Sequence, residues 1–209
     1  MVKIDFFYDI VSPYSYLAFE VLERYRESWK LDLVMRPAFL AGVFKATGNE
    51  APAVLPSRGA YLAQDLRRAA KYFDLPLGFP EDFPANTLST MRLLSLVADE
   101  RPERLLPLSR AFWQRSWRDS QEVSKPDSMR AVCAAVDVDP ALVDRIGEQA
   151  VKDRLKAHTD EAVARGAFGF PAMLTVIDGD EQLFFGSDRL NVMAFELGLP
   201  WHGPQPSRR

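Results

Sequence analysis

The first 36 residues most constrain the fold, because they read as a strand, a helix and a second strand. Residues 3–11 (KIDFFYDIV) carry the β-branched and aromatic side chains typical of a buried strand. Ser12-Pro13 then supplies a helix N-cap and a proline for the first helical position. Apolar residues continue at helical spacing as far as Trp29, and residues 31–36 (LDLVMR) alternate as a second strand. We expect the two strands to pair in parallel as a right-handed βαβ unit.

Helical patterns fill the middle of the chain, with prolines between positions 76 and 84 breaking them. The large apolar residues of this block could wall a substrate pocket or form a core, and we interpret them as core. They are Phe79, Phe83, Phe112 and Trp117. The predicted helices span about 62–73, 87–100, 103–117, 126–136 and 148–165.

Strand patterns return near the C-terminus, at residues 171–177 and 181–185. The Asp178-Gly179 pair between them is a strong hairpin signal. A last helix follows, opened by Ser187-Asp188 and closed by Gly198. This order predicts an α/β protein, a thioredoxin-like domain with a large all-helical insertion. The expected boundaries are 1–55 and 147–209 for the thioredoxin-like domain, and 56–146 for the insertion.

Composition excludes several function classes. A net charge of −3 and a pI near 5.5 disfavour nucleic-acid or anionic-membrane binding, both of which need a basic patch. No apolar run reaches the 18 residues of a membrane span, and no secretory h-region precedes the first strand. The single cysteine, Cys133, cannot form an internal disulfide, which fits a reducing compartment.

Other chemistries find no support in the sequence. His158 lies on an apolar helical stripe and Cys133 in the run AVCAAV, so both are interpreted as packed residues. Two histidines and one cysteine give no metal-site spacing, and we predict no metal. The G-x-S-x-G elbow of hydrolases and a glycine-rich phosphate loop are absent.

Five segments together resemble the kappa-class glutathione transferases. They are FYDIVSPYSYLAFEVLERY, TGNEAP, LPSRGAY, GAFGFP and FGSDR, and the resemblance covers nearly the whole chain. That class belongs with the 2-hydroxychromene-2-carboxylate isomerases and is related to Dsb-type disulfide oxidoreductases. In disulfide oxidoreductases two cysteines occupy the ends of the active turn, whereas Ser12 and Ser15 stand there here. A self-contained thiol-disulfide oxidoreductase is therefore excluded.

The resemblance implies glutathione as substrate and Ser12 as the catalytic residue. Its hydroxyl would stabilise the glutathione thiolate, and without the resemblance it would read only as an N-cap. Ser15 is interpreted as a supporting residue. Phe170 would pair through its main chain with the cysteinyl residue of glutathione, beside a cis peptide bond at Pro171.

The same resemblance implies binding sites for the two ends of glutathione. Ser187 and Asp188 would hold the γ-glutamyl end, where an aspartate suits the ammonium and a helix N-terminus suits the carboxylate. Asn49 and Arg58 would reach the glycine end, and Tyr61, one helical turn beyond Arg58, would line the same pocket. Arg58 stands where family members have lysine, and a guanidinium can bind a carboxylate bidentately.

Three functions remain open from the sequence. The first is glutathione transfer to a small apolar electrophile, a detoxification reaction, with peroxide reduction as an additional activity. The second is a glutathione-dependent 2-hydroxychromene-2-carboxylate isomerase, which the short connection FPANTLSTMR leaves open. The third is a non-catalytic peptide-binding module. FGSDR and TGNEAP favour the first. The resemblance also implies a homodimer, in the cytoplasm if bacterial or the mitochondrial matrix if eukaryotic.

Overall fold

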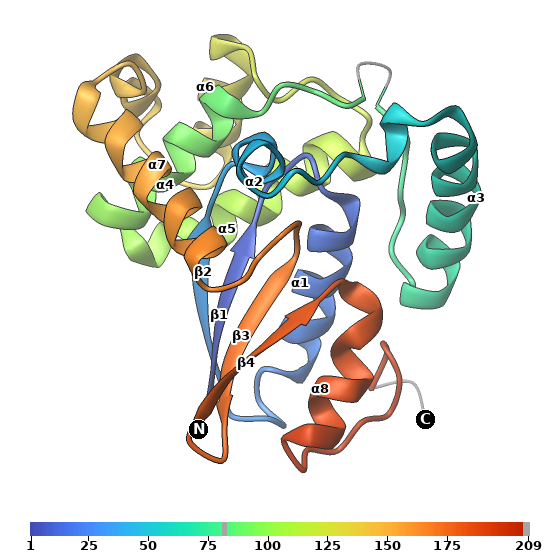
Figure 1. The fold of residues 1–209 in the computed structure, drawn as a ribbon. Helices are drawn as coiled ribbons and strands as arrows, with labels where there is room; N and C mark the ends of the chain where they lie inside the picture. Colours follow the sequence, from blue (N-terminus) through green and yellow to red (C-terminus); the bar gives the residue numbers. More distant parts are fainter. Residues whose placement is uncertain (81–82, 207–209) are drawn as a thin grey trace.

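A four-stranded mixed sheet in the order β2-β1-β3-β4 is the centre of the molecule (Figure 1). The computed structural model describes residues 1–80 and 83–206. Strand β1 (Val2–Tyr8) pairs in parallel with β2 (Leu31–Pro37), as the βαβ pattern predicts. Strand β3 (Ala172–Ile177) is antiparallel to both β1 and β4 (Asp180–Phe185).

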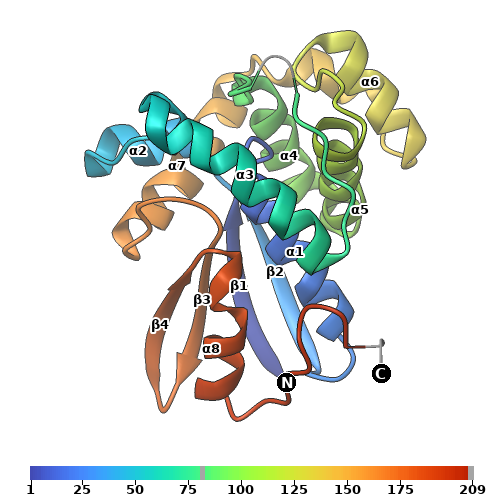
Figure 2. The ribbon, with the colours of Figure 1, turned by 90° about the vertical axis from the view of Figure 1, so that its right-hand side faces the viewer.

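Helices cover both faces of this sheet. Helices α1 and α8 lie on one face and α7 on the other, while α4, α5 and α6 gather beyond the end where β1 finishes (Figures 1 and 2). Helix α3 crosses in front of α1 (Figure 2). The helices are α1 (Pro13–Tyr25), α2 (Leu40–Thr47), α3 (Pro56–Phe73), α4 (Leu88–Glu100), α5 (Pro102–Trp113), α6 (Pro126–Ala135), α7 (Gln149–Ala164) and α8 (Leu190–Glu196).

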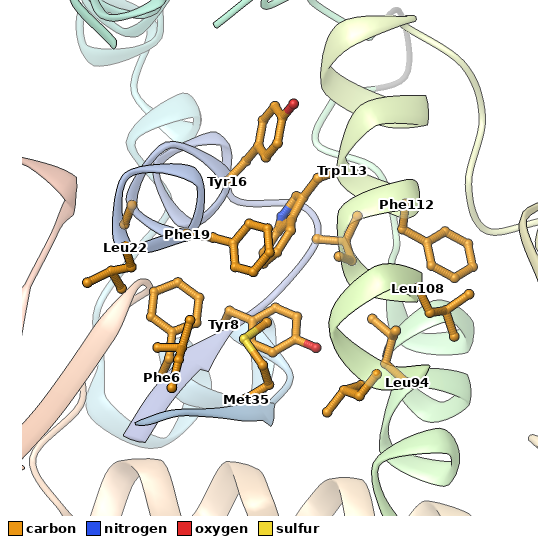
Figure 3. Packing of buried hydrophobic residues seen from close by; sticks show 14 of the residues in the cluster. Phe6, Tyr8, Tyr16, Phe19, Leu22, Met35, Leu94, Leu108, Phe112 and Trp113 are labelled. Carbon is orange, nitrogen blue, oxygen red and sulfur yellow. The ribbon is translucent and has the colours of Figure 1, made fainter. Parts of the chain in front are cut away.

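The core joins the sheet to the insertion through aromatic packing. Trp113 of α5 is fully buried, and its ring centroid lies 4.9 Å from that of Tyr8 and 5.0 Å from that of Phe19 (Figure 3). Tyr8 ends β1 and Phe19 lies on α1, so three elements meet at one indole. The whole of Phe6–Tyr8 is buried as well, as expected of a central strand covered on both faces.

The predicted hairpin is confirmed at the β3–β4 turn. Asp178 and Gly179 both have positive φ, 53° and 93°. A two-residue hairpin whose turn residues both have positive φ matches the twist of the strands, and aspartate and glycine tolerate that conformation.

Several predicted boundaries differ from the structure. The first strand ends at Tyr8 instead of residue 11, because the Asp9 side chain accepts the Val11 N–H and turns the chain. The first helix ends at Tyr25, well before Trp29. Helix α2 was not predicted at all. The helix expected over 103–117 becomes α5 followed by a π-helical turn, Gln114–Arg118.

The start of the last helix also differs from the prediction. Ser187 begins a separate 3₁₀ turn, Ser187–Arg189, and α8 starts only at Leu190. Neither Ser187 nor Asp188 is an N-cap, because the cap positions of these two elements are Gly186 and Arg189. Helix capping therefore does not explain why a serine and an aspartate occupy these two positions.

The C-terminal segment is tied to α1 and α3 through Arg24. Its Nη1 donates to the carbonyl of Phe73 at 2.6 Å and to that of Pro204 at 2.8 Å. Tyr25 donates to the carbonyl of Gly203 at 2.7 Å. The end of α3 and Pro204 thus share one guanidinium, and Gly203 is held by the neighbouring Tyr25.

Other packed residues follow the sequence interpretation. Cys133 is buried, and burial raises the pKa of its thiol to about 11. His158 is half-buried, with Nδ1 3.1 Å from the carbonyl oxygen of Pro37. None of the helices in residues 1–80 and 83–206 is long and apolar enough to cross a membrane. The domain boundaries at 55 and 147 stay a prediction.

Candidate active site

A cavity of about 900 Å³ opens beyond the C-terminal end of β1. Every predicted site residue except Pro171 lines it, although these residues lie far apart in sequence. The cavity therefore brings the predicted residues together in one place. Its walls come from residues 9–14, 39–44, 49–53, 58–65, 83–87, 168–170 and 185–188.

Ser12 lies at the start of α1 with its hydroxyl in the cavity wall. It is the N-cap, and its Oγ accepts the backbone N–H of Ser15 at 3.1 Å. The same hydroxyl donates to the carbonyl oxygen of Phe170 at 3.1 Å. Only 5% of Ser12 is exposed. A buried hydroxyl at a helix N-terminus combines a hydrogen-bond donor with a positive dipole end, which together favour an anion.

The segment opposite Ser12 is Phe170-Pro171, joined by a cis peptide bond as the sequence predicts. Phe170 is buried, and its carbonyl oxygen faces Ser12 and accepts the hydroxyl of that residue. The carbonyl of Pro171 accepts the Gly186 N–H at 3.0 Å, which holds the 185–188 segment next to this turn.

Asn49 organises the loop between α2 and α3. Its Nδ2 donates to the Phe168 carbonyl at 2.7 Å, and its Oδ1 accepts the Glu50 N–H at 2.8 Å. The side chain thus ties this loop to the residues just before the cis peptide bond. Its predicted contact with the glycine end of glutathione stays a prediction.

Charged groups lie on α3 and on the 3₁₀ turn. Arg58 and Tyr61 are exposed on α3, and Arg58 has no ion-pair partner among the described residues. Asp65, one helical turn beyond Tyr61, accepts the Tyr14 hydroxyl at 2.6 Å. Asp188 lines the same smaller cavity as Asp65. The site therefore has a cation at one position and two carboxylates at another, of which Asp188 also pairs with Arg189 at 3.3 Å.

Tyr14 connects the active turn to α3. Burial, together with the neighbouring Asp65 carboxylate, raises the pKa of Tyr14, so the phenol keeps its proton and donates it to Asp65. This contact fixes α3, which carries Arg58 and Tyr61, against the turn that carries Ser12.

Asp9 is a buried carboxylate under the cavity wall. Its Oδ1 accepts the Val11 N–H at 3.0 Å and the Thr87 hydroxyl at 2.6 Å, and its Oδ2 accepts the Leu40 N–H at 2.9 Å. Burial raises the pKa of the Asp9 carboxyl, and these donors oppose the rise. One side chain thus joins the active turn, the start of α2 and the loop before α4.

Replacing Thr87 by valine tests this junction. The variant keeps the side-chain shape but removes a donor to a buried carboxylate, so we expect a loss of about 1.5–3 kcal/mol in the free energy of unfolding at neutral pH. The loss should shrink in acid, because the variant raises the Asp9 pKa further and a protonated carboxyl no longer needs the donor. Urea unfolding at several pH values measures both effects.

Thr90→Val is the matched control, because Thr90 is buried and donates to a neutral carbonyl, that of Val123, at 2.9 Å. Its loss should be smaller, about 0.5–1.5 kcal/mol, and should not vary with pH through the Asp9 titration. Equal and pH-independent losses in both variants would contradict the role given to Asp9.

Phenylalanines form an apolar wall of the cavity. Phe39 and Phe44 come from the α2 region, Phe83 from the loop before α4, and the rings of Phe168 and Phe185 lie 4.5 Å apart between centroids. Phe112 and Trp117 are buried, as interpreted from the sequence, and Trp117 donates to the Ile10 carbonyl. Phe83 is partly buried against the core, with its ring centroid 5.4 Å from that of Trp117, and it also lines the cavity. Phe79 is 46% exposed, so the core interpretation is wrong for Phe79.

Fold and site together define a thioredoxin-fold protein in which a serine, Ser12, caps the first helix at the wall of the cavity. The DSBA-like thioredoxin domain family matches residues 3–198. A solved structure of 2-hydroxychromene-2-carboxylate isomerase has the same fold, with a TM-score of 0.82, 24% identity and 94% of both chains covered. The predicted thioredoxin-like fold with a helical insertion is confirmed.

The chain belongs to the family of the kappa-class glutathione S-transferases. It is 38% identical to human glutathione S-transferase kappa 1 over 97% of this chain and 94% of that protein. It is 28% identical to the 2-hydroxychromene-2-carboxylate isomerase of Sphingobium xenophagum over 91% of this chain and 95% of that protein. Both relatives carry the names of enzymes, so the chain is an enzyme and the non-catalytic binding module is set aside.

Proposed function

We propose that this enzyme binds glutathione in the described cavity and conjugates it, through its thiol sulfur, to small apolar electrophiles. The observation that carries the proposal is the Ser12 hydroxyl, placed at the N-terminus of α1 and facing the main chain of Phe170. A tripeptide that pairs with Phe170 as a short strand brings its central cysteine to this hydroxyl.

Two sources of stabilisation act on the thiolate at this position. Lowering a thiol pKa from ~8.5 to ~6.5 needs about 2.7 kcal/mol of preferential stabilisation of the anion. A helix N-terminus gives about 0.3–1 kcal/mol, rising to ~2 where partly buried. A hydrogen bond to a charged group gives about 1.5–3 kcal/mol. The combined range for Ser12 and the start of α1 includes the required amount.

Binding also frees the Ser12 hydroxyl for this task. Without ligand its proton is donated to the Phe170 carbonyl. When the cysteinyl N–H of glutathione donates to that carbonyl, the hydroxyl can rotate and donate to the sulfur. Ser12 keeps the Ser15 N–H as a donor to its own oxygen, which holds the hydroxyl in place.

The charged groups suit the two ends of glutathione. Arg58, supported by Asn49 and Tyr61, would bind the glycine carboxylate. Asp188 and Asp65 would bind the γ-glutamyl ammonium, with Ser187 beside them. The ligand would then span the active turn between these ends.

The isomerase activity would use the same thiolate as a reversible nucleophile. Higher identity to the kappa-class relatives favours transfer. Peroxide reduction and the homodimer stay predictions.

Calorimetry and a transfer assay test the proposed function together. We expect glutathione to bind in the millimolar range or tighter, and to raise the melting temperature because only the folded cavity holds it. S-methylglutathione, whose sulfur cannot ionise, should bind without supporting transfer to 1-chloro-2,4-dinitrobenzene. Absence of glutathione binding would overturn the proposal.

A further inference from the structure

The cavity has an unequal balance of charge. Four carboxylates line it, those of Asp9, Glu50, Asp65 and Asp188. Arg58 is the sole cation among the described lining residues. A second carboxylate in this cavity therefore has no guanidinium of its own among the described lining residues, and, like the γ-glutamyl carboxylate of glutathione, it depends on neutral hydrogen-bond donors.

Glutathione already uses that guanidinium in the proposed function, on which this inference rests. Its glycine carboxylate takes Arg58, and its ammonium takes the acidic end at Asp65 and Asp188. The second substrate is left with the apolar wall, which carries no cation among the described residues.

Three hydrogen-bond donors of that wall are also occupied. The N–H groups of Val11 and Leu40 and the hydroxyl of Thr87 could have received a ligand carboxylate, and all three donate to Asp9 instead. Asn86 adds a neutral amide whose oxygen accepts the Leu88 N–H. The protein's own carboxylate therefore fills the place where a ligand anion would be bound.

We propose that the second-substrate site selects uncharged electrophiles and rejects those that carry a carboxylate. A carboxylate on the apolar wall would lose its water without gaining a cation, and would lie near the Asp9 side chain. Burying an unpaired charge beside a like charge is costly, and such repulsion gives specificity against a competitor.

Two chemically matched electrophiles test this. Methyl 4-chloro-3,5-dinitrobenzoate and the free 4-chloro-3,5-dinitrobenzoate differ in one methyl group and in charge. In both, the glutathione thiolate forms a C–S bond at the chlorinated ring carbon and chloride leaves with the electron pair of the C–Cl bond. Enzymatic kcat/KM is divided by the uncatalysed rate constant with free glutathione at the same pH, which removes the difference in intrinsic reactivity.

We expect the normalised kcat/KM for the ester to exceed that for the acid by about 20-fold or more. Equal values would overturn the inference and leave the proposed function standing. Turnover of neither compound, with no glutathione binding in calorimetry, would overturn the proposed function and this inference with it.

A lysine introduced into the apolar wall tests whether the charge or the size of the carboxylate causes its rejection. Ala41 is an exposed position on α2 that lines the cavity, so Ala41→Lys places an ammonium there. The acid-to-ester ratio should rise several-fold in Ala41→Lys relative to Ala41→Gln, a neutral control of similar length. An unchanged ratio would show that the acid is rejected by its shape, and would overturn the electrostatic explanation.

Discussion

Replacing Ser12 by alanine is expected to raise the thiol pKa of bound glutathione by about one to two units, because ~1.5–3 kcal/mol of anion stabilisation is lost. Transfer near neutral pH should then fall roughly 10- to 100-fold, in proportion to the thiolate fraction. A higher thiol pKa leaves a smaller fraction of thiolate at neutral pH. The lost activity should therefore return as the pH rises above the new pKa. Thiolate absorbance near the ultraviolet edge, titrated with pH, measures the pKa directly.

Ser15→Ala is the control, and the structure makes it a sharp one. The Ser15 hydroxyl is fully buried and has no hydrogen-bond partner among the described residues. Its removal should leave both the thiol pKa and the activity unchanged. Ser12→Ala should still fold, because losing an N-cap costs about 0.5–2 kcal/mol. A pKa shift in Ser15→Ala, with none in Ser12→Ala, would assign the chemistry to the other serine.

The second large effect is expected in the core, at Trp113. Replacement by alanine leaves a cavity between β1, α1 and α5, and we expect the free energy of unfolding to fall by about 3–5 kcal/mol. The stability of a typical domain is about 5–15 kcal/mol, so little would remain. Chemical unfolding followed by circular dichroism measures the loss.

Trp113→Phe separates the packing of this residue from its polar group. The indole N–H has no hydrogen-bond partner among the described residues, so phenylalanine removes no hydrogen bond. It should retain much of the contact with Tyr8 and Phe19 and cost clearly less than alanine. A loss below about 1 kcal/mol in Trp113→Ala would mean that the insertion does not depend on this contact.

Local patterns explain which parts of the fold could be predicted from the sequence. Strand β1 and the start of α1 have their own signals, namely a buried apolar run and a Ser-Pro cap. Helix α2 lacks such signals: it buries only Val43, and its first turn is held from outside. The Leu40 N–H donates to Asp9, and the Phe39 N–H donates to the hydroxyl of Thr159 on α7. Distant partners of this kind leave no periodic pattern.

The same limit applies to the site. Ser12, Phe170 and the 187–188 pair could be named because short motifs carry them. Asp9 and Asp65 could not, since Asp9 meets Thr87 across 78 residues and Asp65 meets Tyr14 across 51. An aspartate at the end of a buried strand was the one available signal, and by itself it did not indicate which donors would surround it.

We expect the shared contact at Arg24 to link the C-terminal segment to glutathione affinity, through the proposed role of Arg58 on α3. Residues 203–204 and the end of α3 are held by the same pair of neighbouring side chains, Arg24 and Tyr25. Deleting the segment after α8, or pulling on it with a bulky affinity tag, would loosen α3 and with it Arg58. Such an altered protein would show a raised KM for glutathione, while the pKa of the glutathione thiol bound beside Ser12 would stay unchanged. An N-terminal tag is the safer choice, because the chain starts at the opposite end of the sheet from the cavity (Figure 1).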